Sequence, residues 1–383
     1  MLASRGVSAA TQGGSNASSV TGRIEAQTSI GRGVALNTAR HRNMERLHPS
    51  RTSHIPGQTA GQVSGHVSGH VSGHLLRYRA DVRSIAFVAT YGVLATTGWL
   101  FTPHSPWLVA LWVAATCVSS WIVGVVTHNT IHAPVFRHRA LNRAFQVWLS
   151  LSYGWPVSEY GPGHNLSHHK HTQKGKDLMR TTRVHFRWNL LNLLAFGPFA
   201  AARVARANQQ FAARAKVRAK SWYRQFMLET VIVWAVKIAL VCLSWKKALL
   251  FVFIPHLYAV WGIVEVNYLW HDGCDEDHPY NHSRNFVGRV FNFFTLNNGY
   301  HGIHHMQPSL HWSLAPKAHA ELVHPFIHPA LEQRSLIVYL VRTFAWPGRR
   351  VRYTGEPIDP VDPSDEPFIT ELGAAEMAEL KLA

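Results

Sequence analysis

Four long apolar runs set the strongest limit on how this chain can fold. The first two contain no Asp, Glu, Lys or Arg, and each approaches the roughly 20 helical residues needed to cross the hydrocarbon core of a bilayer. Lys237 lies inside the third run and Glu265 near the end of the fourth; charged groups at membrane depth face protein or water. We therefore predict an all-α, multi-spanning membrane protein, with spans near residues 84–102, 107–127, 226–245 and 248–266.

Charge and cysteine content exclude several other classes. The net charge is 38 − 21 = +17, which raises the possibility of a nucleic-acid partner. However, the basic residues flank the apolar runs, as is typical of proteins that contact an anionic membrane surface. We therefore predict that the partner of these basic residues is a lipid bilayer and that the protein does not bind nucleic acid. Cys117, Cys242 and Cys274 are far apart and form no CxxC motif. This spacing argues against an iron–sulfur cluster and a disulfide framework.

Loop charges predict the sidedness of the membrane domain. Basic residues precede the first run and follow the second, and seven more lie between Arg203 and Arg224. The loop between the first two runs contains no Lys or Arg. By the positive-inside rule, both termini and the long middle segment are predicted to be cytoplasmic.

Composition divides the chain into three parts. Residues 1–76 contain a GHVS repeat and are rich in Ser, Gly and Arg, which predicts a disordered low-complexity tail; an Arg- and Ser-rich, acid-poor composition is also that of an organelle transit peptide. Residues 77–350 form the predicted membrane domain, and residues 351–383 a flexible acidic tail. Two shorter apolar stretches, residues 144–155 and 186–202, are predicted to be interfacial or re-entrant helices.

Histidines are clustered at four places in the apolar body, near residues 128–132, 164–169, 267–271 and 301–305. Helical residues at i, i+3 and i+4 share one face, so each cluster can aim two or more side chains at one point. Spans two and four end at clusters on the predicted cytoplasmic side, which brings all four clusters to that side. The predicted metal ligands are His128, His132, His164, His168, His169, Asn267, His271, His301, His304 and His305.

The number and type of these side chains limit the chemistry. Imidazole suits zinc, copper, iron and nickel, and nine clustered histidines exceed the needs of one ion, so two ions are expected. The HExxH motif of zinc hydrolases is absent, and carboxylates are scarcer than in soluble di-iron bundles. The pattern favours O2 chemistry on a lipid-like substrate. A membrane metal transporter would instead place histidines along a path through the bilayer.

These clusters resemble the histidine boxes of the membrane fatty acid desaturase superfamily: HxxxH, HxxxHH or HxxHH, HxxHH, and one more histidine after the last span. The similarity covers about residues 84–350. It implies two histidine-ligated iron ions, O2 as co-substrate, four membrane helices and a cytosolic helical cap that holds the di-iron site. It also implies a lipid or fatty-acyl substrate and a separate electron donor, such as a ferredoxin, a rubredoxin or a cytochrome b5-like protein.

The resemblance is less specific for the reaction. The NYLWHDG stretch, residues 267–273, is similar to the NYxxHYG box of membrane alkane hydroxylases. However, Asn129 stands where their first box has Glu, and residues 297–300 read NNGY where they have LQRH. Carotenoid ketolases and hydroxylases share similar boxes. We therefore predict a fatty acid (acyl-lipid) desaturase, with a hydroxylase or ketolase of an alkane, lipid or carotenoid as the alternative.

Overall fold

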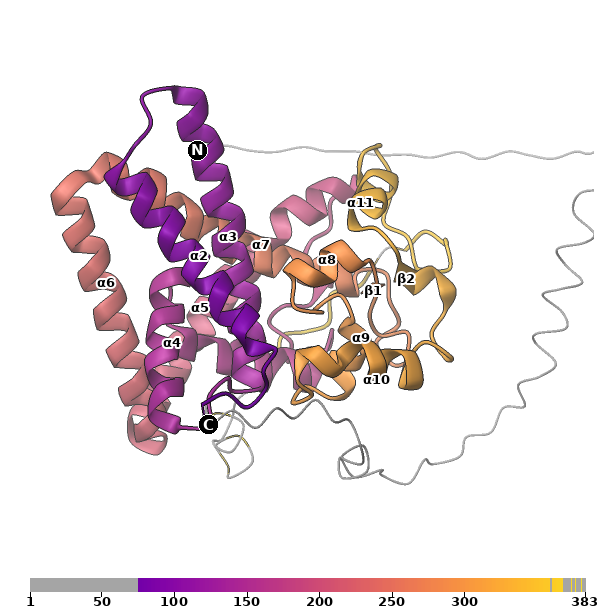
Figure 1. Ribbon diagram of the computed structural model, residues 1–383. Coiled ribbons are helices and arrows are strands. Elements are labelled where there is room, and N and C mark those ends of the chain that lie inside the picture. The colour runs from indigo at the N-terminus through magenta and orange to yellow at the C-terminus, as the bar shows by residue number, and fades with distance from the viewer. Residues whose placement is uncertain (1–74, 359, 368–372, 374–375, 377–379, 381–383) are drawn as a thin grey trace, which may run out of the picture. The chain divides into compact units, whose positions relative to one another are not determined.

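The structure, a computed structural model, describes residues 75–358, 360–367, 373, 376 and 380. Helices dominate this part of the chain, and its only sheet is a pair of two-residue parallel strands (Figure 1). The prediction of an all-α fold is therefore confirmed. The elements are α2 (Asp81–Leu100), α3 (Pro106–His132), α4 (Arg139–Tyr153), η1 (Val157–Glu159), the π-helix η2 (Gly161–His169), η3 (Thr181–Arg183), α5 (Asn189–Arg218), α6 (Lys220–Ala248), the π-helix η4 (Leu249–Phe253), α7 (Ile254–His271), β1 (Asn285–Phe286), α8 (Arg289–Phe294), α9 (His301–Met306), η5 (Trp312–Leu314), α10 (Ala315–Leu322), η6 (Pro329–Leu331), β2 (Glu332–Gln333) and α11 (Leu336–Phe344).

Each of the four apolar runs forms a helix. The third and fourth runs lie in one stretch, Lys220–His271, in which the extended backbone of Ser244 interrupts α6 near its end and η4 connects α6 to α7. Within the described residues, two helical segments are long and apolar enough to cross a membrane by length and composition: α3 and the stretch Lys220–His271. The count of four spans stays a prediction.

Helix α5 is longer than the sequence suggested. A short helix over residues 186–202 was predicted, but α5 extends over 30 residues, because the Ala, Arg, Gln and Lys residues that follow the apolar run are strong helix formers. The Gly197 N–H, next to Pro198, donates a hydrogen bond to Glu265 Oε1 at 2.9 Å. Glu265 therefore ties α5 to α7.

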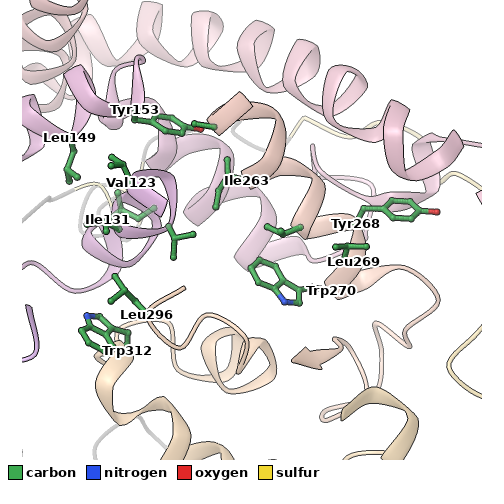
Figure 2. Packing of buried hydrophobic residues seen from close by; sticks show 14 of the residues in the cluster. Val123, Ile131, Leu149, Tyr153, Ile263, Tyr268, Leu269, Trp270, Leu296 and Trp312 are labelled. Atoms are coloured by element: carbon green, nitrogen blue, oxygen red, sulfur yellow. The ribbon is translucent and has the colours of Figure 1, made fainter. Parts of the chain in front are cut away.

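The buried core connects the long helices to the segments that follow α7. Helix α3 packs against α2 and α7, and α7 also packs against α5. Figure 2 shows Val123 and Ile131 from α3 near Leu149 from α4 and Ile263 from α7, all of them buried. The same cluster includes Trp312 in η5. The ends of α3 and α7 are thus fixed by one continuous core.

The two predicted tails differ in how much of them is described. Residues 1–74 lie outside the described residues. Among the C-terminal residues, Asp362 and Asp365 form ion pairs with Arg180, at 2.6 and 2.9 Å. Arg180 is completely buried. The described part of the acidic segment thus neutralises a buried cation, while the flexibility of the whole segment 351–383 stays a prediction.

Candidate metal centre

Four segments bring nine histidines together. Helix α3 carries two of them in its last turns, α7 ends at one, η2 carries three, and α9 carries another three. The side chains form two compact groups, within each of which the potential ligand atoms all lie within 4.8 Å of one another. The five-histidine group is His128, His132, His164, His169 and His304, and the four-histidine group is His168, His271, His301 and His305.

The second box does not follow α-helical spacing. Because η2 is a π-helix, with i→i+5 hydrogen bonds, residues five apart face the same way. The Nε2 atoms of His164 and His169 accordingly lie 3.0 Å apart in the five-histidine group, whereas His168 belongs to the other group. The prediction that His164 and His168 aim at one point is therefore wrong, and the adjacent residues His168 and His169 serve different groups.

The α-helical boxes follow the i, i+4 spacing, but the prediction that His304 shares a face with His301 and His305 is wrong. His128 and His132 share the five-histidine group, four residues apart on α3. On α9, His301 and His305 share the four-histidine group, while His304 points into the other. Each of η2 and α9 therefore supplies ligand candidates to both groups, which keeps the groups next to each other.

The imidazole nitrogens converge at close range. In the five-histidine group, the Nε2 atom of His169 lies 3.0 Å from those of His164 and His304. In the four-histidine group, the Nε2 atom of His301 has two such neighbours, at 3.0 and 3.1 Å. A ring nitrogen of a neutral imidazole carries either a proton or a lone pair. A nitrogen that faces two others at this distance is better explained by lone pairs that converge on a shared ion.

The spacing and the unpaired nitrogens both fit metal ions. Metal–imidazole bonds of about 2.1 Å at right angles separate two nitrogens by about 3.0 Å, whereas a tetrahedral angle gives about 3.4 Å. The Nε2 atoms of His128, His132 and His168 are buried and have no hydrogen-bond partner among the described residues, which would be costly without a ligand. The spacing of the nitrogens therefore fits two ions whose coordination number is higher than the four of tetrahedral zinc.

Burial keeps the imidazoles in the form that binds metal. Burial is the main cause that lowers the pKa values of His164, His169, His301, His304 and His305, and the positive charge that neighbouring imidazoles would carry lowers them further. Only the neutral ring has a lone pair available for a metal ion. Burial thus favours the neutral form of these five imidazoles.

Asp177 holds the metal-ligand candidate His168 in position, and it was not among the site residues predicted from the sequence. It is completely buried, and its Oδ2 atom lies 3.0 Å from His168 Nδ1. Such a partner fixes the tautomer and the orientation of a metal-binding histidine. A signal was available, because Asp177 is the only acidic residue within residues 160–228.

The cluster at residues 267–271 contains His271, which belongs to the four-histidine group, and Asn267, which belongs to neither group. His271 Nδ1 lies 3.0 Å from the carbonyl oxygen of His282, which leaves Nε2 free to face the four-histidine group. Asn267 donates a hydrogen bond from Nδ2 to the Met179 carbonyl at 2.9 Å and lies on the wall of the cavity described below. That Asn267 contributes a metal ligand stays a prediction.

Two hydrogen bonds join the turn before α9 to the end of α3. Asn129 Nδ2 donates to the Leu296 carbonyl at 3.4 Å, and its Oδ1 accepts from Asn298 Nδ2 at 2.9 Å. Leu296 and Asn297 both have positive φ, which is uncommon for a buried leucine. Strained backbone of this kind persists where surrounding contacts demand it, and here it leads directly into the last histidine box.

An apolar cavity of about 340 Å³ reaches the histidines. His128, His164 and His301 lie on its wall, so both groups border it. The rest of the wall comes from α4, η1, η2, α5, α6 and α7 and from the segments between them, and is largely aromatic and aliphatic. A long apolar chain could therefore lie with its carbon atoms against the histidine groups.

Comparison with known proteins agrees with this geometry. The family model for fatty acid desaturase matches residues 105–334, well over half of the chain and all nine clustered histidines. The chain belongs to the fatty acid desaturase family. A comparison with curated proteins finds no match. Membership of this desaturase family makes the protein an oxidoreductase of lipid chains, in a family that is membrane-associated and typically metal-dependent.

Proposed function

We propose that this protein is a membrane-bound, O2-dependent di-iron oxidoreductase that desaturates an aliphatic lipid chain, most simply a fatty-acyl chain. The observation that carries this proposal is the pair of buried histidine groups beside an apolar cavity. The five-histidine group and the four-histidine group would each hold one iron. Iron is favoured over zinc because the nitrogen spacing and the number of histidines suit coordination above four.

The chain's own residues would prepare this site for the reaction. When bound, the two irons would supply redox chemistry that activates O2 and removes hydrogen from an unactivated methylene group. Asp177 orients His168 through a hydrogen bond, and the largely apolar wall of the cavity can bind the hydrocarbon part of a substrate. Holding the substrate carbon in place decides between a double bond and a hydroxyl or keto product, so a hydroxylase or ketolase stays the alternative function.

Membrane topology and electron supply complete the proposal. We assign the four spans to α2, α3, α6 and α7, with the histidine groups and both termini on the cytoplasmic side, as the loop charges predict. The three cysteines cannot form a cluster, so electrons would come from a separate donor. The basic segment 203–224 includes the exposed residues Arg206, Lys216 and Arg218 on α5, and an acidic donor could dock there.

Metal analysis and lipid profiling test the function together. Purified protein should contain two irons per chain, and a host that expresses it should gain double bonds in its lipids. His304→Ala should lose iron and product, whereas His138→Ala, which removes an exposed histidine outside both groups, should keep both. New hydroxyl or keto groups would favour the alternative function. A single zinc with no iron would overturn the proposal.

A further inference from the structure

The cavity wall differs in polarity from one side to the other. None of the residues that line it, all within the described part of the chain, is Lys or Arg. Glu159 in η1 and Asn208 and Gln209 in α5 form a polar side, whereas the facing wall from α6 and α7 is mostly apolar. Gln209 and Trp234 are exposed although they line the cavity. The cavity therefore opens between α5 and α6.

The polar side contains hydrogen-bonding groups without partners. Asn208 is 5% exposed; its Nδ2 donates to the Glu159 backbone carbonyl at 3.2 Å, but its Oδ1 is buried without a partner among the described residues. Burial, and secondly the charge of Glu229, raises the pKa of Glu159 to about 7. The side chains of Asn208 and Glu159 are thus available to a polar group that enters the cavity.

The buried cation near the cavity is already engaged. Lys237 Nζ donates to the Gly154 carbonyl at 2.6 Å and lies over the rings of Trp155 and Trp234, at 4.7 and 5.2 Å. Lys237 itself is not part of the cavity wall. A carboxylate or phosphate in the cavity would therefore lack a cation on the wall and would meet the acidic Glu159 instead.

We propose that the cavity selects an uncharged long-chain lipid that carries an alcohol hydroxyl, bound by Glu159 and Asn208. A hydroxyl group carries one proton to donate, so it can donate it to Asn208 Oδ1 or to the Glu159 carboxylate, whereas an ionised carboxylate has no proton for either acceptor. The proposal rests on the proposed function, because it names the substrate class of the same site. Among possible substrates it favours a neutral alcohol over a free fatty acid or a lipid with a phosphate headgroup.

Direct binding tests this selection without turnover. The probes are a long-chain primary alcohol, the carboxylate of equal length and the matching alkane, measured by equilibrium binding to the full chain in non-ionic detergent at mildly alkaline pH. The wild type should bind the alcohol roughly tenfold more tightly than the carboxylate. Asn208→Leu should weaken alcohol binding roughly three- to tenfold and leave alkane binding unchanged.

Two further variants separate charge from hydrogen bonding. Glu159→Gln retains hydrogen-bonding capacity but removes the negative charge, so alcohol binding should persist while carboxylate binding becomes tighter. Thr90→Val, a change of similar shape at an exposed position of α2 outside the cavity wall, should alter none of the three affinities. A wild-type preference for the carboxylate that is lost in Lys237→Met would overturn the proposal. So would an equal loss of all three ligands in Asn208→Leu.

The iron content of the same samples separates this proposal from the proposed function. Alcohol-selective binding to a protein that holds no iron under any loading condition would overturn the di-iron function and support the selection. Two irons and product formation without preference for the alcohol would overturn the selection alone.

Discussion

Replacing Asp177 by Asn should lower both the stability of the protein and its affinity for metal, by amounts that follow from the hydrogen bonds of Asp177. The Oδ2 atom of Asp177 faces His168 Nδ1 and accepts from the Gln173 N–H at 2.8 Å, while Oδ1 accepts from the Met179 N–H at 2.8 Å. Asn has one carbonyl oxygen and one NH2 group, so at least one buried N–H then faces another N–H. That loss costs about 1–3 kcal/mol of folding free energy.

The effect on metal affinity is the sharper measurement. Changing the carboxylate partner of a metal-binding histidine to a neutral amide lowers metal affinity by about 10–100-fold, or about 1.4–2.7 kcal/mol. Iron retained per chain, measured across a series of chelator concentrations, should show Asp177→Asn losing iron at a correspondingly lower concentration. Asp277→Asn is the control, because its side chain is 76% exposed and should shift nothing. Identical curves for wild type and Asp177→Asn would refute the supporting role of this carboxylate.

Three other predictions follow from the same geometry. His168→Ala and His169→Ala should each lose a different iron and the double variant both, measured as iron per chain; loss of both irons in each single variant would contradict the split. Gly154→Ala should lower the free energy of unfolding by about 2–4 kcal/mol, because Gly154 has a φ of +89° and an added Cβ would collide with the buried ring of His256 in α7. Denaturant titrations measure this change, and an unchanged midpoint would contradict it. Burial opposes the pKa shift of Asp362, but the hydrogen bond from Arg180 and the nearby positive charges lower its pKa below 3.8. The Tm difference between wild type and Asp362→Asn should therefore be full at pH above 3.8 and vanish as the pH falls through the lowered pKa; a difference that grows in acid would contradict the sign.

The sequence predicted what depends on local patterns. Apolar runs without charges became helices, because few other structures satisfy the backbone of such a run. The pair His128 and His132 entered one group because α3 is a regular α-helix up to its end. The tendency of four boxes to gather followed from the helix ends and the loop charges, which are also local features.

The features that were missed depend on departures from those patterns. The sequence around His168 and His169 does not indicate whether the segment forms an α-helix or a π-helix. The placement of these two neighbours in different groups therefore could not be inferred. Asp177 gave a local signal as an isolated acid. The partners of Arg180 lie more than 180 residues away, and no local pattern specifies such pairing.

The burial of Arg180 has a consequence for the order in which the protein is made. Asp177 and Arg180 leave the ribosome long before Asp362 and Asp365 are synthesised. A guanidinium without those carboxylates is costly to bury, although the Gly175 and Asp177 carbonyls also accept hydrogen bonds from it. We therefore expect the loop that carries Asp177 to pack less firmly when Asp362 and Asp365 are absent. The support of His168 by Asp177 thus depends on residues more than 180 positions further along the chain.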